Sequence, residues 1–338
     1  ASGGGTLHDF HRIAIHEFGH ALGLDHPDEA NQTVVAIMNA FESNIDSLQQ
    51  DDINGADFLY GAPSPAPTPT PPPAAADNLV NLSTRGFVGR DDRMLIGGFI
   101  VQGAQPTSVV LRALGPSLAT SGLAGTLPDP VIELRDASGN VLQTNDDWKE
   151  DPSAATINSK GLAPKDERES ALMASVSSGN YTLLVHGYNG VTGIGLVELY
   201  DLQATSARAA NISTRGTVLT GDGVMIAGFI VGGDEQKPVI LRALGPSLAS
   251  SGVSGVLGNP TLELYNSGGT LIGSNDDWRN GPDAGTIQSK GLAPAKDRES
   301  ALLRTLNPGS YTAVLRGFNG GTGVALAEVY DLSPPPNQ

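Results

Sequence analysis

The sequence of 338 residues contains no cysteine, only two tryptophans and 5% aromatic residues. The absence of cysteine excludes disulfide bonds and metal sites with thiolate ligands. No apolar run reaches the roughly 18 residues that a membrane-spanning helix needs, and no signal-peptide pattern is visible. Basic residues are scarce as well, with 20 against 36 acidic residues and a net charge of −16. Because nothing forms a basic stripe, we expect no nucleic acid partner. Because no apolar run is long enough, we expect no membrane span.

The most informative segment that is present reads H-E-F-G-H-A-L-G-L-D-H over residues 16–26. In a helix, residues four apart project from one face, so His16 and His20 can direct ring nitrogens at one ion. Gly23 can end that helix and let the chain turn back, which brings His26 to a third ligand position. Three protein ligands leave a fourth position for water, which is typical of a catalytic Zn2+ site.

Glu17 follows the first of these histidines and is expected to act as the general base rather than as a ligand. A carboxylate there can accept the proton of the zinc-activated water as it attacks a peptide carbonyl, and can pass that proton to the leaving amine. The alternative is an accidental match on an amphipathic helix, which five residues permit far more readily than the full eleven-residue pattern. We therefore predict zinc-dependent hydrolysis of peptide bonds.

The motif resembles the signature of the metzincin metallopeptidases, which continues into a methionine turn. Residues 36–39, A-I-M-N, stand where that turn would fall, and residues 48–61 are similar to the closing helix of the matrixin branch. The resemblance implies that Met38 forms an apolar floor under the metal, with His16, His20 and His26 as ligands and Glu17 as base.

Two departures from the pattern leave the branch of the family open. Pro27 after the third histidine is closer to the serralysin branch, and Met38 lacks the proline or tyrosine that these relatives often place after it. The resemblance covers residues 1–61, the back half of such a catalytic domain. We therefore expect a fragment of a longer secreted protein, with a truncated, inactive remnant as the alternative.

A proline-rich stretch separates this segment from the rest of the chain. Residues 62–73 contain seven prolines, which enforce an extended polyproline II conformation and so act as a spacer. The expected organisation is a matrixin-like fragment at 1–61, a linker at 62–76, a β-sandwich at 77–203, a short linker at 204–207, a second β-sandwich at 208–333 and a tail at 334–338.

The two expected sandwiches are copies of one sequence, offset by 130 residues without drift. The segment N-L-S-T-R-G at 81–86 returns as N-I-S-T-R-G at 211–216, and L-R-A-L-G-P-S-L at 111–118 recurs unchanged at 241–248. This spacing far exceeds the 20 to 50 residues of solenoid repeats, so it indicates duplication of a whole domain. We call residues 77–203 copy 1 and residues 208–333 copy 2.

Each copy reads as short strands separated by turns, which predicts a mainly β fold of two tandem antiparallel β-sandwiches preceded by a small α-helical fragment. Residues 136–140 and 189–193 are expected as hairpin loops, and residues 154–162 and 284–292 as helical turns. The D-x-S-G-x-x-L-x-x-N-D-D run is similar to that of bacterial pre-peptidase C-terminal domains. We expect the two sandwiches to fold independently of each other and of the zinc segment. The expected strands are 94–101, 108–114, 131–135, 181–188 and 195–202.

Polar residues in copy 1 suggest a second metal site. Asp136, Asn145, Asp146 and Asp147 could supply oxygen ligands to Ca2+, because a hairpin would bring the turn and the next strand end together. Alternatively, these residues cap turns. Copy 2 has Asn266 in place of Asp136, which disfavours calcium there. Arg112 and Arg242 are expected to anchor glutamates or backbone carbonyls, and Trp148 and Trp278 to pack in the core rather than to stack on sugars.

Two function classes therefore compete. The first is a zinc metalloendopeptidase with protein or peptide substrates, whose sandwiches are accessory domains that hold a surface or polymer ligand. The second is a non-catalytic extracellular binding or adhesion array with a vestigial protease stub. The intact motif favours the first. Family and layout suggest export from a bacterium, and the lack of cysteine agrees with that source. We also expect a monomer.

Overall fold

The computed structural model describes residues 26–27, 33–34, 36, 49, 51–52, 54, 79–202 and 207–333. The chain divides into two compact units, Ala1–Pro73 and Ala74–Gln338. In the first unit, Asp51, Asp52 and Asn54 are helical. The carboxylate of Asp52 accepts a hydrogen bond of 2.7 Å from the backbone N–H of Gln49, as acidic residues do in the first turn of a helix. These residues lie within the stretch predicted to form the closing helix.

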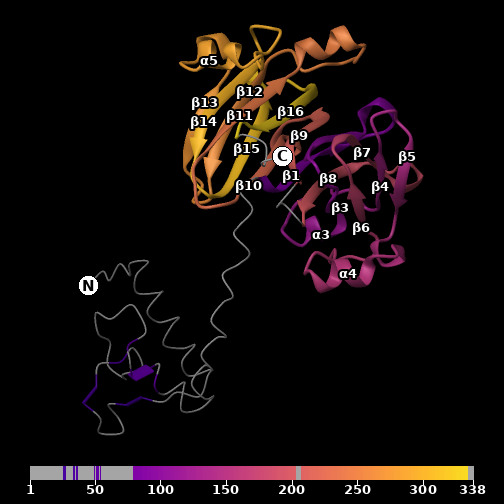
Figure 1. Cartoon of the computed structure of the whole chain (residues 1–338), viewed down its shortest axis with the longest axis vertical. Coiled ribbons are helices and arrows are strands. Elements are labelled where there is room, and N and C mark those ends of the chain that lie inside the picture. Colours follow the sequence, from indigo (N-terminus) through magenta and orange to yellow (C-terminus); the bar gives the residue numbers. More distant parts are fainter. Residues whose placement is uncertain are drawn as a thin grey trace, which may run out of the picture. The chain divides into compact units, whose positions relative to one another are not determined.

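The second unit is built from antiparallel strands with a few short helices (Figure 1), which confirms the mainly β prediction. Within the part of the chain that the structure describes, no helix is long and apolar enough to cross a membrane. Copy 1 holds β1 (Leu79–Val88), β2 (Leu95–Gly103), β3 (Thr107–Leu114), β4 (Pro130–Arg135), β5 (Val141–Asn145), β6 (Ser170–Val176), β7 (Gly179–Gly187) and β8 (Gly193–Asp201).

Copy 2 repeats this order strand for strand. Its strands are β9 (Ala207–Val218), β10 (Met225–Val231), β11 (Lys237–Leu244), β12 (Pro260–Asn266), β13 (Leu271–Asn275), β14 (Ser300–Leu306), β15 (Gly309–Gly317) and β16 (Gly323–Asp331). The predicted helical turns are α4 (Ala154–Ser159) and α5 (Ala284–Ser289), and α3 (Pro116–Ala119) follows β3. The 3-10 turns are η1 (Asp91–Arg93), η2 (Trp148–Glu150), η3 (Tyr188–Gly190), η4 (Gly221–Gly223), η5 (Pro246–Ser251), η6 (Trp278–Asn280) and η7 (Phe318–Gly320).

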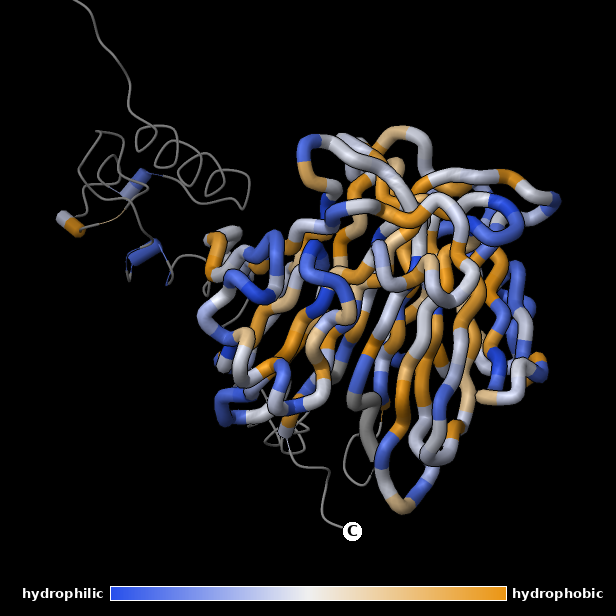
Figure 2. The backbone as a smooth tube through the Cα atoms, turned by 90° about the horizontal axis from the view of Figure 1, so that it is seen from above, coloured by the Kyte–Doolittle hydropathy of each residue, from blue (hydrophilic) through white to orange (hydrophobic). Residues whose placement is uncertain are grey.

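The strands of copy 1 form two groups of four, β6-β3-β8-β1 and β2-β7-β4-β5. Copy 2 forms the equivalent groups β14-β11-β16-β9 and β10-β15-β12-β13. Alternate residues of these strands are buried, and hydrophobic and hydrophilic positions alternate along many strands in Figure 2. Side chains from both groups therefore meet in one apolar core, as in a sandwich.

The first strand of each copy also joins a sheet of the other copy. β1 pairs with β8 of its own copy and with β10 of copy 2, while β9 pairs with β16 and with β2 of copy 1. The expectation of two separate sandwiches is therefore wrong in one respect, because strand pairing joins the first strand of each copy to a strand of the other. Alternating apolar residues show that a strand is buried, but they do not show which edge it joins.

The exchange is symmetric between the copies. Thr84 pairs with Ala227 and Thr214 with Gly97, and the two threonine hydroxyls lie 2.8 Å apart in the buried centre. Gly98 lies opposite Ser213, and Gly228 opposite Ser83; a Cβ on either glycine would lie 2.7 Å from the serine hydroxyl. The close approach explains why the recurring S-T-R-G segment faces glycine. The two copies thus form an isologous pair within one chain.

The turns confirm one of the two predicted hairpins in copy 1. Residues 136–140 join β4 and β5, which pair directly. Residues 189–193 were expected to form a hairpin loop, but β7 pairs with β2 and β4 whereas β8 pairs with β1 and β3. That prediction is wrong, because Asn189 and Gly190 reverse the chain at positive φ without deciding which strand the next segment joins.

Candidate functional site

The predicted zinc site lies almost wholly outside the described residues. His16, Glu17, His20 and Met38 belong to the part of the chain that the structure does not describe. His26, the predicted third ligand, is described and half-buried, and a turn follows at Pro27. The assignment of His16, His20 and His26 as ligands and Glu17 as base remains a prediction from the sequence.

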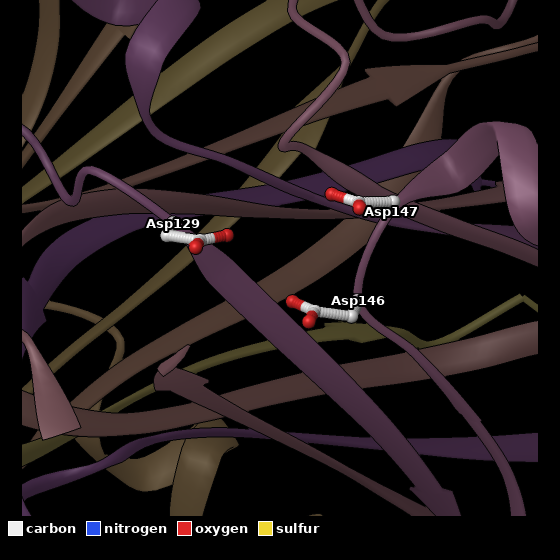
Figure 3. Close-up of side chains that lie close together, drawn as sticks. All are labelled: Asp129, Asp146 and Asp147. Atoms are coloured by element: carbon white, nitrogen blue, oxygen red, sulfur yellow. The ribbon is translucent and has the colours of Figure 1, made fainter. Parts of the chain in front are cut away.

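Three carboxylates of copy 1 meet at one end of the strands, as Figure 3 shows. Asp129 directly precedes β4, and Asp146 and Asp147 directly follow β5, so the β4–β5 pairing brings them together. One oxygen of each carboxylate lies within 4.8 Å of the others. This spacing would allow the three residues to hold a cation with oxygen ligands.

The electrostatics of this acidic cluster, Asp129, Asp146 and Asp147, disfavour three negative charges. Burial, followed by the charge of Asp147, raises the pKa of Asp129 above its ordinary value, while Arg168 opposes the shift. Burial, followed by Asp129 and Asp147, likewise raises the pKa of Asp146. One carboxylate oxygen each of Asp129 and Asp146 is buried without a hydrogen-bond partner. A bound cation would relieve this repulsion.

The other two predicted calcium ligands do not join this cluster. The carboxylate of Asp136 caps its own turn, accepting hydrogen bonds from the backbone N–H groups of Ser138 and Asn140 at 2.8 and 2.9 Å and from the Asn140 amide. These bonds, the Asn140 amide first, lower the pKa of Asp136. Asn145 donates to the Asp147 carbonyl and accepts from the N–H of Ala171. Asp136 and Asn145 therefore hold turns and loops, as the alternative prediction had it. Asp146 and Asp147 lie with Asp129 in the acidic cluster.

Sequence reasoning missed Asp129 because the residue lies apart from the N-D-D segment along the chain. The equivalent position in copy 2 is Asn259, next to Asp276 and Asp277. Burial, followed by Asp277, raises the pKa of Asp276, and a hydrogen bond from Asn259 partly offsets this. The difference between Asp129 and its copy 2 counterpart was a signal available in the sequence.

A second missed residue is Glu169, which is 0% exposed. Its carboxylate accepts hydrogen bonds from the N–H of Gly115 and from the N–H and hydroxyl of Ser117, at 2.9, 2.9 and 2.6 Å. Glu299 of copy 2 is equally buried and repeats these contacts with Gly245 and Ser247. The recurring L-G-P-S-L segment is thus held by a buried carboxylate, which is a structural role.

The arginines and tryptophans also have structural roles, as predicted. Arg112 donates to Glu198 at 2.9 Å and to the Leu162 carbonyl at 2.7 Å, and Arg242 repeats this arrangement with Glu328 and Leu292. Trp278 is 1% exposed and packs against Ile240 and Ile287, while Trp148 packs against the equivalent residues of copy 1. Trp278 therefore offers no open face for a sugar, whereas Trp148 is half-buried.

The comparisons with known proteins bear on the N-terminal segment. The family model described as Matrixin matches residues 5–61. Macrophage metalloelastase of Oryctolagus cuniculus is 41% identical over 51 residues, which is 15% of this chain and 11% of that protein. The chain thus spans about a tenth of the length of this curated relative.

A chain from the structure entitled "Life in the extremes: atomic structure of Sulfolobus Turreted Icosahedral Virus" aligns with 78% of this chain and 90% of its own length. The TM-score is 0.21 and the sequence identity 10%, so this likeness carries no argument. The sequence matches therefore support a matrixin-type metallopeptidase region over residues 5–61.

Proposed function

We propose that residues 1–61 supply the zinc-binding part of a metalloendopeptidase that acts on protein or peptide substrates. The observation that carries the proposal is the eleven-residue motif from His16 to His26, which lies within the region matched by the matrixin model. Three imidazoles beside a carboxylate have the donor chemistry of a catalytic zinc site, and His26 is half-buried rather than enclosed in a core.

Each residue of the motif has a distinct task in this proposal. His16, His20 and His26 would hold Zn2+, which when bound activates water and polarises the peptide carbonyl. Glu17 accepts a proton and returns it to the leaving amine. Met38 supplies the apolar floor. Substrate alignment needs more of a catalytic domain than residues 1–61, and the chain spans 11% of the length of its curated relative, so the proposed hydrolysis is assigned to a complete catalytic domain.

Metal content tests the ligand assignment. Purified chain should carry one Zn2+, and His20→Ala should lose most of it, because two imidazoles and water bind zinc far more weakly than three imidazoles. His186→Ala is the matched control, since this histidine lies in copy 1, outside the motif. Equal zinc content in the His20→Ala variant and the unmodified chain would refute the assignment.

Turnover separates the two function classes. In a protein with the complete catalytic domain, Glu17→Gln should retain zinc and lose about 10²-fold or more in kcat, because proton transfer has lost its base. A non-catalytic adhesion array would show no peptide hydrolysis in either form. Unchanged turnover at normal zinc content would assign the base to another residue.

We further propose that the β unit is an extracellular accessory region that holds a surface or polymer ligand, in a monomeric protein exported by a bacterium. The strand exchange supports a monomer, because the chain already supplies both partners of the isologous pairing. Sedimentation analysis of the purified chain tests this, with a concentration-dependent dimer as the contrary result.

Calcium remains a proposal for copy 1, with Asp129 in the place predicted for Asp136. The support is the group of three carboxylates and the buried, unpartnered oxygens of Asp129 and Asp146. Calcium should raise the melting temperature of the chain, and Asp129→Asn, which installs the copy 2 residue, should abolish that rise. An identical calcium response in both proteins would rule out this location.

A further inference from the structure

A cleft of about 840 Å³ lies where the exchanged strands β1 and β9 meet, at the pairing of Phe87 with Thr217. This volume falls within the range of small-molecule sites, roughly 300–1,000 Å³. Copy 1 lines one side with the turn at residues 89–93, and copy 2 lines the other with Ser254, Gly255 and residues 322–324. The cleft therefore exists only when the two copies are paired.

The turn at residues 89–93 has different side chains in the two copies. Copy 1 reads G-R-D-D-R and the equivalent turn of copy 2, residues 219–223, reads L-T-G-D-G, although both form the same 3-10 turn. Asp91 has φ of 52° and its counterpart Gly221 has φ of 58°. Glycine takes this left-handed conformation without strain, whereas a side chain there costs free energy. The fold therefore does not require the charged residues of copy 1.

Packing under the turn shows a second difference between the copies, because the glycine and the larger residue occupy opposite ends of the turn. A Cβ on Gly89 would lie 2.7 Å from the Cβ of Arg93, and a Cβ on Gly223 would lie 2.7 Å from that of Leu219. One member of each pair must therefore be glycine. Copy 2 keeps the large residue at the start of the turn, whereas copy 1 keeps Arg93 at its end, where Arg93 lines the cleft.

The chemistry of the cleft fits a neutral ligand rich in hydroxyl groups. Arg90 and Arg93 are balanced in charge by Asp91 and Asp92, so the turn has no net charge. The Nε of Arg90 donates to the Gly190 carbonyl, which leaves its terminal N–H groups, the Arg93 guanidinium and the two carboxylates as donors and acceptors for a ligand. The copy 2 side of the cleft carries no charge and adds the hydroxyls of Ser254 and Thr322. A cationic or anionic polymer would gain no net attraction from this turn, because it would meet two like and two unlike charges. Vicinal hydroxyl pairs can instead bridge a guanidinium and a carboxylate.

We propose that this cleft binds a neutral oligosaccharide, with Arg90, Asp91 and Arg93 as the polar contacts and Phe87 as an apolar contact. The inference rests on the polymer-binding part of the proposed function and gives that part a site and a ligand class. It does not depend on the zinc segment.

The test uses the full chain and calorimetric titration with three named probes, cellohexaose, xylohexaose and maltohexaose. The unmodified chain should bind at least one of them saturably. A turn graft that installs the copy 2 residues, Arg90→Thr with Asp91→Gly and Arg93→Gly, should weaken that binding tenfold or more. The matched control removes an exposed ion pair of copy 2, Arg279→Gln with Asp297→Asn, and should leave the affinity unchanged.

The graft should not lower the melting temperature, because glycine adopts the positive φ of position 91 freely. Should it fail to fold, Arg90→Gln with Asp91→Asn carries the test, since asparagine tolerates the left-handed region. Binding that survives the substitution would refute the cleft as the binding site and would assign polymer binding to another surface. Binding of polygalacturonate in preference to all three neutral probes, or of none of the four, would overturn the ligand class as well.

Discussion

Copy 1 and copy 2 share eight equivalent strands and the same internal pairing, but their loops carry different side chains. Residues that recur in both copies, such as Glu169 with Glu299 and Thr84 with Thr214, are buried and hold the strands and turns together. Positions that differ, such as Asp91 against Gly221 and Asp129 against Asn259, lie at the cleft or in the acidic cluster. The duplication thus separates the requirements of the fold from the chemistry added to it.

The largest effect should come from the buried carboxylates. Glu169→Ala and Glu299→Ala should each cost about 3–5 kcal/mol of unfolding free energy, because several buried N–H groups lose their acceptor. Since strand pairing joins the copies, we expect the chain to unfold in one transition, and either variant should lower the denaturant concentration at its midpoint. The exposed Glu167→Ala is the control, with an effect near zero. Two separate transitions would show that the copies unfold independently.

A cross-link between the copies should have the next largest effect. The chain has no cysteine, so Thr84→Cys with Thr214→Cys introduces a single pair, at positions whose hydroxyls lie 2.8 Å apart. An intrachain disulfide should form and stabilise the fold by about 3 kcal/mol. The reduced form of the same protein is the control. Disulfide-linked dimers would show instead that the strands exchange between chains.

A smaller effect should follow from exchanging the residues of the positive-φ turn position. Asp91→Gly should stabilise the chain by about 1 kcal/mol, and Gly221→Asp should destabilise it by a similar amount, because only glycine takes this conformation without cost. Thermal unfolding of the two variants measures both changes. A loss of stability in Asp91→Gly would mean that the carboxylate makes a stabilising contact in the fold.

The smallest effect concerns the pH dependence of the acidic cluster. The pKa values of Asp129 and Asp146 are raised above 3.8, so the folded state binds more protons than the unfolded state in the pH range just above that value. Stability should therefore fall as pH rises from about 4 toward neutrality. Asp129→Asn should flatten this slope, and Asp136→Asn, whose pKa is shifted the other way, should not. Equal slopes of stability against pH in the unmodified chain and both variants would exclude repulsion among the carboxylates of the acidic cluster.

The sequence by itself determined the local structure and the candidate chemistry. Alternation of apolar residues located strands such as β3 and β4, and short-range turn chemistry located α4 and the β4–β5 hairpin. The spacing from His16 to His26 predicted a zinc site because helix geometry fixes the separation of those residues. The matrixin match over residues 5–61 supports that region, while the ligand assignment stays a prediction.

Only the tertiary structure decided which strands β1 and β9 join and which carboxylates meet. The pattern of buried residues in β1 is satisfied by any partner edge, and the symmetric contacts of Thr84 with Thr214 and of Ser83 with Gly228 select the other copy. Asp129 reaches Asp146 because β4 and β5 pair between them, and the cleft lies at the meeting of two copies. Periodicity acts over a few residues, whereas these contacts depend on long-range packing.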